Sequence, residues 1–189
     1  AVKHVATEAD RLAIALLATP YEAGLYAFAT HYGSLIARLV LAPGEDACRL
    51  ALAKCASHER AASIGGLFAK GALYVGLVCA AVGAPFGAAA ARILKGNAPE
   101  NDIAGCGAAL AFFCLQVPCL SLNGVCEACA HARADARALA LLSGVHVACA
   151  LLFALCARPA LATTGPPGLV AAGGAVMALR ALVALYLAR

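Results

Sequence analysis

The residues of this sequence that could do chemistry are the few charged side chains inside long apolar runs. Arg38 is the clearest, because residues 32–40 are otherwise almost entirely uncharged and apolar. An ionisable group in a membrane or a core is costly and usually faces a partner or a polar cavity. Arg38 therefore predicts either an ion pair with Glu45 or Asp46, or a cavity in which the guanidinium binds a phosphate. Glu45 also has the i,i+4 spacing that pairs with Arg49.

A second group of charges stands at the start of the chain. Both signs of charge and a threonine fall within three helical turns there, at Lys3, Thr7, Glu8, Asp10 and Arg11. On a helix they would form a polar face at a membrane surface. That face is interpreted either as a network around an anionic group or as side chains that reach out to the lipid headgroups.

Asn123 and Glu127 form the third group, four residues apart and therefore on one helical face. Gly124 between them allows a second helix to approach closely. The pattern predicts a buried amide–carboxyl hydrogen bond that joins two helices, with a role in substrate binding as the alternative. Three other polar residues stand alone in apolar runs and are interpreted as packing or snorkelling residues: Lys70, His146 and Arg180.

The ten cysteines are interpreted mainly as small apolar packing residues, because most lie inside apolar runs. Cys126, Cys129 and His131 have local spacing that would suit zinc, but no second ligand pair follows them, so a metal is not expected. The sequence shows no nucleophile elbow, phosphate-binding loop or dinucleotide fingerprint. We therefore predict no catalytic residues, no cofactor and no nucleic-acid partner.

Composition indicates what must position these side chains. Of the 189 residues, 63% are hydrophobic and 13% charged, whereas soluble domains carry roughly 25% charged residues. This argues against a soluble enzyme domain and against a disordered segment. The prediction is an all-α, polytopic transmembrane bundle that forms a single membrane domain over residues 1–189.

Runs long enough to cross a bilayer predict about six membrane helices. They cover residues 3–19, 22–56, 61–83, 103–126, 138–157 and 167–188. Breaks are expected at Pro20, Pro85, residues 96–99, residues 158–159 and residues 165–167, with a short amphipathic helix over residues 86–95.

Charge at the ends of these segments predicts their orientation. Seven basic residues fall on one side, at Lys3, Arg11, Lys54, Arg60, Arg133, Arg137 and Arg189. Three fall on the other, at Arg92, Lys95 and Arg158. Because cytoplasmic loops carry the excess of lysine and arginine, both ends of the chain are predicted to be cytosolic.

Three stretches together resemble one family. They are Lys3-His4-x-x-Thr7-Glu8-Ala9-Asp10-Arg11, Tyr32-Gly33-Ser34-Leu35-x-Ala37-Arg38-Leu39-x-x-x-Pro43-x-Glu45-Asp46, and Leu122-Asn123-Gly124-Val125-x-Glu127-Ala128. In type, order and separation they are similar to the Rft family of eukaryotic endoplasmic-reticulum membrane proteins. The similarity is thin after about Ala138, and Cys126 and Cys129 stand where the family more often has threonine and aromatic residues.

The resemblance implies a role in translocating a dolichol-diphosphate-linked oligosaccharide for N-glycosylation, directly or as a helper, with membrane lipids as the surroundings. It also implies the second lobe of a two-lobed exporter-type fold, with the first lobe absent from this fragment. On this view Arg38, Lys3 and Arg11 contact the diphosphate. The other motif side chains would support them: Glu8, Asp10, Ser34, Glu45, Asp46, Asn123 and Glu127. The alternatives are a non-transporting scaffold of the glycosylation machinery and a cation-coupled multidrug exporter.

Overall fold

The computed structural model describes residues 14–55, 57–133 and 135–187. Its elements are α2 (Pro20–Ile36), the π-helical turn η1 (Ala37–Leu41), α3 (Ala42–Ala53), α4 (His58–Lys95), α5 (Glu100–Arg133), α6 (Ala136–Thr164) and α7 (Pro166–Leu187). Five helical segments of the described chain are long and apolar enough to span a membrane, with α2, η1 and α3 together forming the first. The predicted all-α polytopic bundle is therefore confirmed.

The first break comes at Pro20, as the sequence predicts. Thr19 caps α2 in a capping box: Glu22 N–H donates to Thr19 Oγ1 at 3.3 Å, and Thr19 N–H donates to Glu22 Oε2 at 2.8 Å. Proline suits the first turn of a helix, because its missing N–H would have no partner there. Most of the predicted membrane segment over residues 3–19 lies outside the described residues.

The predicted long helix over residues 22–56 is present, with one irregular turn. At η1 the N–H of Ala42 donates to the carbonyl of Ala37, five residues back. Pro43 follows directly; its ring would crowd the carbonyl four residues before it in a regular α-helix, and it has no N–H to donate. The wider π turn relieves that crowding while the rod continues through α3.

Two predicted breaks are wrong, because Pro85 lies inside α4 and Pro159 inside α6. There is accordingly no separate helix over residues 86–95. Pro85 stands between Gly83 and Gly87, and α4 packs closely against α5 at both glycines. Tertiary packing of this kind keeps proline inside membrane helices. The true ends lie at Gly96 (φ 58°) and Gly165 (φ 67°), where positive φ favours glycine.

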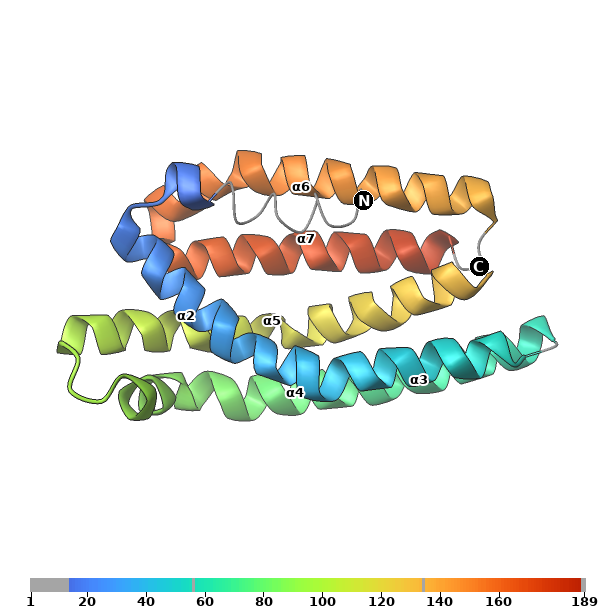
Figure 1. Ribbon diagram of the computed structural model, residues 1–189, viewed down its shortest axis with the longest axis horizontal. Coiled ribbons are helices and arrows are strands. Elements are labelled where there is room, and N and C mark those ends of the chain that lie inside the picture. Colours follow the sequence, from blue (N-terminus) through green and yellow to red (C-terminus); the bar gives the residue numbers. More distant parts are fainter. Residues whose placement is uncertain (1–13, 56, 134, 188–189) are drawn as a thin grey trace.

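Helix α5 is the centre of the bundle and packs against α2, η1, α3, α4 and α7. Figure 1 shows the α2–α3 rod crossing this helix, with α4 along one side and the α6–α7 pair along the other. Small residues bring the backbones together: a Cβ on Gly76 of α4 would lie 2.6 Å from the Cα of Pro118 of α5. Close approach of small residues is the main way membrane helices gain packing energy.

Candidate functional site

The motif residues at the start of the chain, Lys3, Glu8, Asp10 and Arg11, lie outside the described residues. The remaining predicted site residues fall on the α2–α3 rod and on α5. Because that rod packs against α5, the second and third motifs are neighbours in space although about eighty residues separate them in sequence.

Arg38 lies in the π turn η1 and is exposed on the outside of the bundle. Its Nη2 donates to Ser34 Oγ at 2.7 Å, one turn earlier, and Ser34 Oγ in turn donates to the His31 carbonyl at 2.9 Å. Within the described part of the chain, no carboxylate pairs with Arg38. The ion pair considered for Arg38 with Glu45 or Asp46 is therefore not formed, and the guanidinium is held by a hydroxyl instead.

Glu45 reaches α5 rather than its own helix. A Cβ built on Gly124 would lie 1.8 Å from Glu45 Oε1, so the carboxylate occupies the space that any side chain at position 124 would need. The expected close approach at Gly124 is confirmed, and the group that makes it is a motif glutamate. The expected Glu45–Arg49 pair is wrong: Arg49 Nη1 instead lies 3.6 Å from Asp46 Oδ1.

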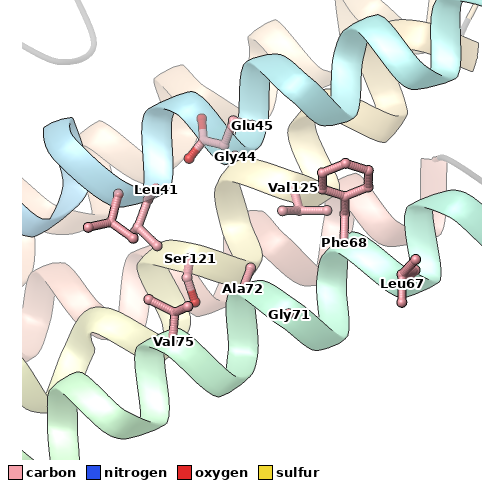
Figure 2. A pocket seen from close by; sticks show the side chains of 11 residues that line it. Leu41, Gly44, Glu45, Leu67, Phe68, Gly71, Ala72, Val75, Ser121 and Val125 are labelled. Carbon is pink, nitrogen blue, oxygen red and sulfur yellow. The ribbon is translucent and has the colours of Figure 1, made fainter.

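Beside Glu45, a cavity of about 360 Å³ lies between the rod, α4 and α5. Figure 2 shows Leu41 and Glu45 on one wall, Phe68, Gly71 and Val75 of α4 on another, and Ser121 and Val125 of α5 behind them. Glu45 is the single charged residue among those that line it. Arg38 does not line this cavity. Glu45 therefore lies at the cavity, whereas Arg38 lies on the outer surface.

Glu127 is the hub of a buried polar cluster that joins three helices. Its Oε1 accepts hydrogen bonds from Asn123 Nδ2 of α5 at 3.0 Å and from Arg180 Nη2 of α7 at 2.7 Å, and it lies 3.0 Å from His146 Nε2 of α6. Only 4% of Glu127, 5% of Asn123 and 6% of His146 is exposed. An unpaired carboxylate at this depth would be strongly unfavourable, so Arg180 compensates it.

The predicted bond between Asn123 and Glu127 is present, but it lies within α5 and does not itself join two helices. The interhelical connections come from His146 and Arg180, whose interpretation as packing or snorkelling residues is wrong. Lys70, by contrast, is exposed on α4. One signal in the sequence could have indicated the cluster. A glutamate in an apolar run needs a cation nearby, and His146 and Arg180 are basic residues in apolar runs to which no acid had been assigned.

The cluster leaves two buried atoms without a hydrogen bond to any described residue, namely Asn123 Oδ1 and Arg180 Nε. Arg180 is 17% exposed at its side chain. A polar network inside a low-dielectric bundle fixes helix positions most firmly when every member is satisfied. This one joins α5, α6 and α7, and because two of its atoms are unsatisfied it keeps unused hydrogen-bonding capacity.

Half of the cysteines are buried packing residues, as the sequence predicts, whereas Cys156 is exposed. All ten are free thiols, and Cys48, Cys106, Cys114, Cys126 and Cys149 are buried. Cys129 packs where α5 meets α4, and a Cβ on Gly65 would lie 2.9 Å from its sulfur. In the described part of the chain, no group of three or more histidine, cysteine or acidic side chains is arranged to hold a metal ion.

Comparison with known proteins finds relatives that share one name. The protein is 33% identical over 132 residues to the Man(5)GlcNAc(2)-PP-dolichol translocation protein RFT1 of Saccharomyces cerevisiae, covering 67% of this chain and 23% of the relative. It is 32% identical over 133 residues to the protein of the same name from Candida glabrata, covering 67% and 24%. Over a shorter stretch of 55 residues, it is 51% identical to the Kluyveromyces lactis protein, covering 29% and 10%.

The chain thus spans about a quarter of the length of the first two of these relatives. No solved structure matches it. The family described as Rft protein matches residues 1–188, which is nearly the whole chain. The match over nearly the whole chain, with relatives more than 30% identical, shows that the chain belongs to the Rft protein family.

Proposed function

We propose that this chain is part of a membrane protein that translocates Man(5)GlcNAc(2)-PP-dolichol, or assists its translocation, across the endoplasmic-reticulum membrane for N-glycosylation. The observation that carries the proposal is the family match over residues 1–188, together with relatives that bear this name. The proposal assigns no chemical step to the chain: its residues would bind and position a lipid-linked sugar and would not break bonds.

The diphosphate of such a substrate needs a cation with several donors. Arg38 suits this role, because it is exposed and its hydrogen bond to Ser34 leaves other guanidinium N–H groups available. We assign Lys3 and Arg11 to the same headgroup on the basis of the motif that contains them. The supporting acids would be Glu8 and Asp10 of that motif, while Glu45, Asn123 and Glu127 would hold the helices that frame the site.

The orientation of the chain in the membrane is assigned from the basic residues at the ends of its helices. Lys54, Arg60 and Arg133 lie at one end of the bundle, where the α3–α4 connection and the end of α5 meet. The positive-inside rule assigns that end to the cytosol. The opposite end, which carries Arg92 and Lys95 at the end of α4, would then face the lumen.

Complementation with the full-length protein tests the proposal. A yeast strain whose own Rft protein is repressed would receive the wild type, Arg38→Ala, Arg38→Lys or the control Arg49→Ala. Arg49 is a half-exposed arginine on the same rod. We expect Arg38→Ala to under-glycosylate a secreted reporter, Arg38→Lys to restore it in part, and Arg49→Ala to match the wild type. Normal glycosylation with Arg38→Ala at wild-type protein levels would contradict the assignment.

A scaffold role is the second candidate, and the cluster around Glu127 favours it. There the motif acid Glu127 is engaged within the bundle, as expected of a residue that fixes its shape. A photoreactive lipid-linked diphosphate separates the two functions. Labelling of the wild type that falls in Arg38→Ala supports substrate binding. Absence of labelling, with crosslinks to another glycosylation protein, supports the scaffold.

A further inference from the structure

Both ring nitrogens of His146 face oxygen acceptors. Nδ1 lies 2.7 Å from the Leu142 carbonyl one turn earlier on α6, and Nε2 lies 3.0 Å from Oε1 of Glu127 on α5. His146 is 6% exposed. The facing groups are a carbonyl and a carboxylate, which are both acceptors while Glu127 is ionised, so the ring supplies the hydrogens for both contacts.

A neutral imidazole carries one N–H, so it can make only one of these two contacts a hydrogen bond. Its other nitrogen would then point a lone pair at an oxygen. The imidazolium form carries two N–H groups and satisfies both contacts at once. The geometry of His146 therefore fits the ring with an additional proton bound.

We propose that His146, Glu127 and Arg180 form a proton-binding site within the membrane, and that the bound proton fastens α6 to α5. When the proton leaves the ring for water, the imidazole becomes neutral, one contact loses its hydrogen, and the contact with Glu127 loses the charge of the ring whichever nitrogen keeps its hydrogen. Arg180 keeps its 2.7 Å bond to Glu127, so the α5–α7 connection remains. This proposal does not depend on which lipid is transported.

The charged groups around the ring are consistent with this assignment. Glu127 faces it from α5, and Arg180 reaches the same carboxylate oxygen from α7. On α6 itself, the thiol of Cys149 is buried one turn later. Glu127 is thus shared by two bases from two helices, and a proton on His146 adds the positive charge that strengthens the contact made by α6.

Helix α6 is the element that would respond. Among the described helices, α7 is its main packing partner. Toward α5 it presents Leu142, which packs with Cys126 and Ala130, and then His146 one turn later. A change in one hydrogen bond therefore alters a large part of what α6 contributes toward α5. Histidine is the side chain whose ordinary pKa, about 6.5, lies within the cellular pH range.

Hydrogen exchange of the full-length protein in lipid nanodiscs tests the proposal. Exchange of the α6 amides near His146 is measured at about pH 5.5 and about pH 8.5, which bracket the ordinary histidine pKa, and corrected for intrinsic rates. We expect protection to fall at least about tenfold at the higher pH, as loss of a charge-assisted hydrogen bond implies. His146→Gln should remove this pH dependence. His31→Gln, at an exposed histidine on α2, should retain it.

Nitrogen-15 spectra of the wild-type histidine rings provide a measurement that needs no variant to fold well. The spectrum of His146→Gln serves only to assign the signal. We expect two protonated ring nitrogens for His146 at the lower pH and one at the higher. A ring with one proton at both pH values, or α6 protection that changes equally in His146→Gln, would overturn the proposal.

Discussion

The carboxylate of Glu45 rests directly on the backbone of Gly124, so that α3 meets α5 at a position where no side chain fits. A Cβ at position 124 would lie 1.8 Å from Oε1 and 2.2 Å from the carboxyl carbon. Two motifs that are far apart in sequence are thereby joined at one contact. Glu45 also lines the cavity between the rod, α4 and α5.

Gly124→Ala should destabilise the protein, because the new methyl group displaces Glu45. Overpacking of this kind costs about 1–3 kcal/mol. The measurement is thermal and denaturant unfolding of the full-length protein in detergent. Gly144→Ala is the matched control, since a Cβ there meets nothing within 4 Å, and it should be neutral or slightly stabilising. Adding Glu45→Ala to Gly124→Ala should recover part of the loss; an unchanged loss would show that Glu45 is not the obstacle.

Glu45→Gln and Asp46→Asn should differ, although the two acids are adjacent in sequence. Asp46 is 71% exposed at its side chain and pairs with Arg49 on the surface, so its change should cost less than about 1 kcal/mol. Glu45 lies between α3 and α5 and lines the cavity, so its change should reduce function in the complementation assay more strongly. Equal glycosylation by both variants would contradict this distinction.

Arg180→Ala should be among the most damaging single changes in the described bundle. It removes the base closest to a carboxylate that is 5% exposed at its side chain. Breaking a buried pair in this way costs about 3–5 kcal/mol, because the remaining charge is uncompensated. Glu127→Gln should recover part of that stability in the double variant. Arg92→Ala is the control, since the Arg92–Glu100 pair is exposed and should contribute less than about 1 kcal/mol.

Thr19→Ala should weaken the start of α2 by about 1 kcal/mol, the usual effect of losing a helix cap. Thr163→Ala is a suitable control, because its hydroxyl bonds only to carbonyls within α6. Unfolding in detergent measures both. A loss for Thr163→Ala as large as for Thr19→Ala would show that the capping box has no special role.

The sequence predicts helix ends well where glycine with positive φ closes a helix, as at Gly96 and Gly165. It fails at Pro85 and Pro159. A local rule treats proline as a helix breaker, whereas α4 stays helical through Pro85, where it packs closely against α5 at Gly83 and Gly87. That packing involves residues far along the chain and cannot be inferred from the proline and its neighbours.

The candidate site shows the same limit. Asn123 and Glu127 were predictable as a pair, because spacing of four residues on one helix is a local property. Their connection to His146 and Arg180 depends on how α5, α6 and α7 pack, and no spacing rule specifies that. The contact between Glu45 and Gly124 was predictable only in part. The glycine indicates that another helix approaches closely, but only the fold shows that the approaching group is the carboxylate of Glu45.

The π turn at Ala37–Leu41 also has a consequence for how this rod tolerates insertions and deletions. It accommodates one residue more than a regular α-helical turn of the same span. Deleting one residue there would restore a regular α-helix and leave α3 at nearly the same rotation relative to α2, because the wide turn takes up the additional residue. A deletion in a regular stretch of α3 before Glu45 would instead turn the rest of the rod by about 100°, so that Glu45 would face away from Gly124. By taking up the additional residue, the π turn keeps the sides of α2 and α3 that pack against α5 aligned along one continuous rod.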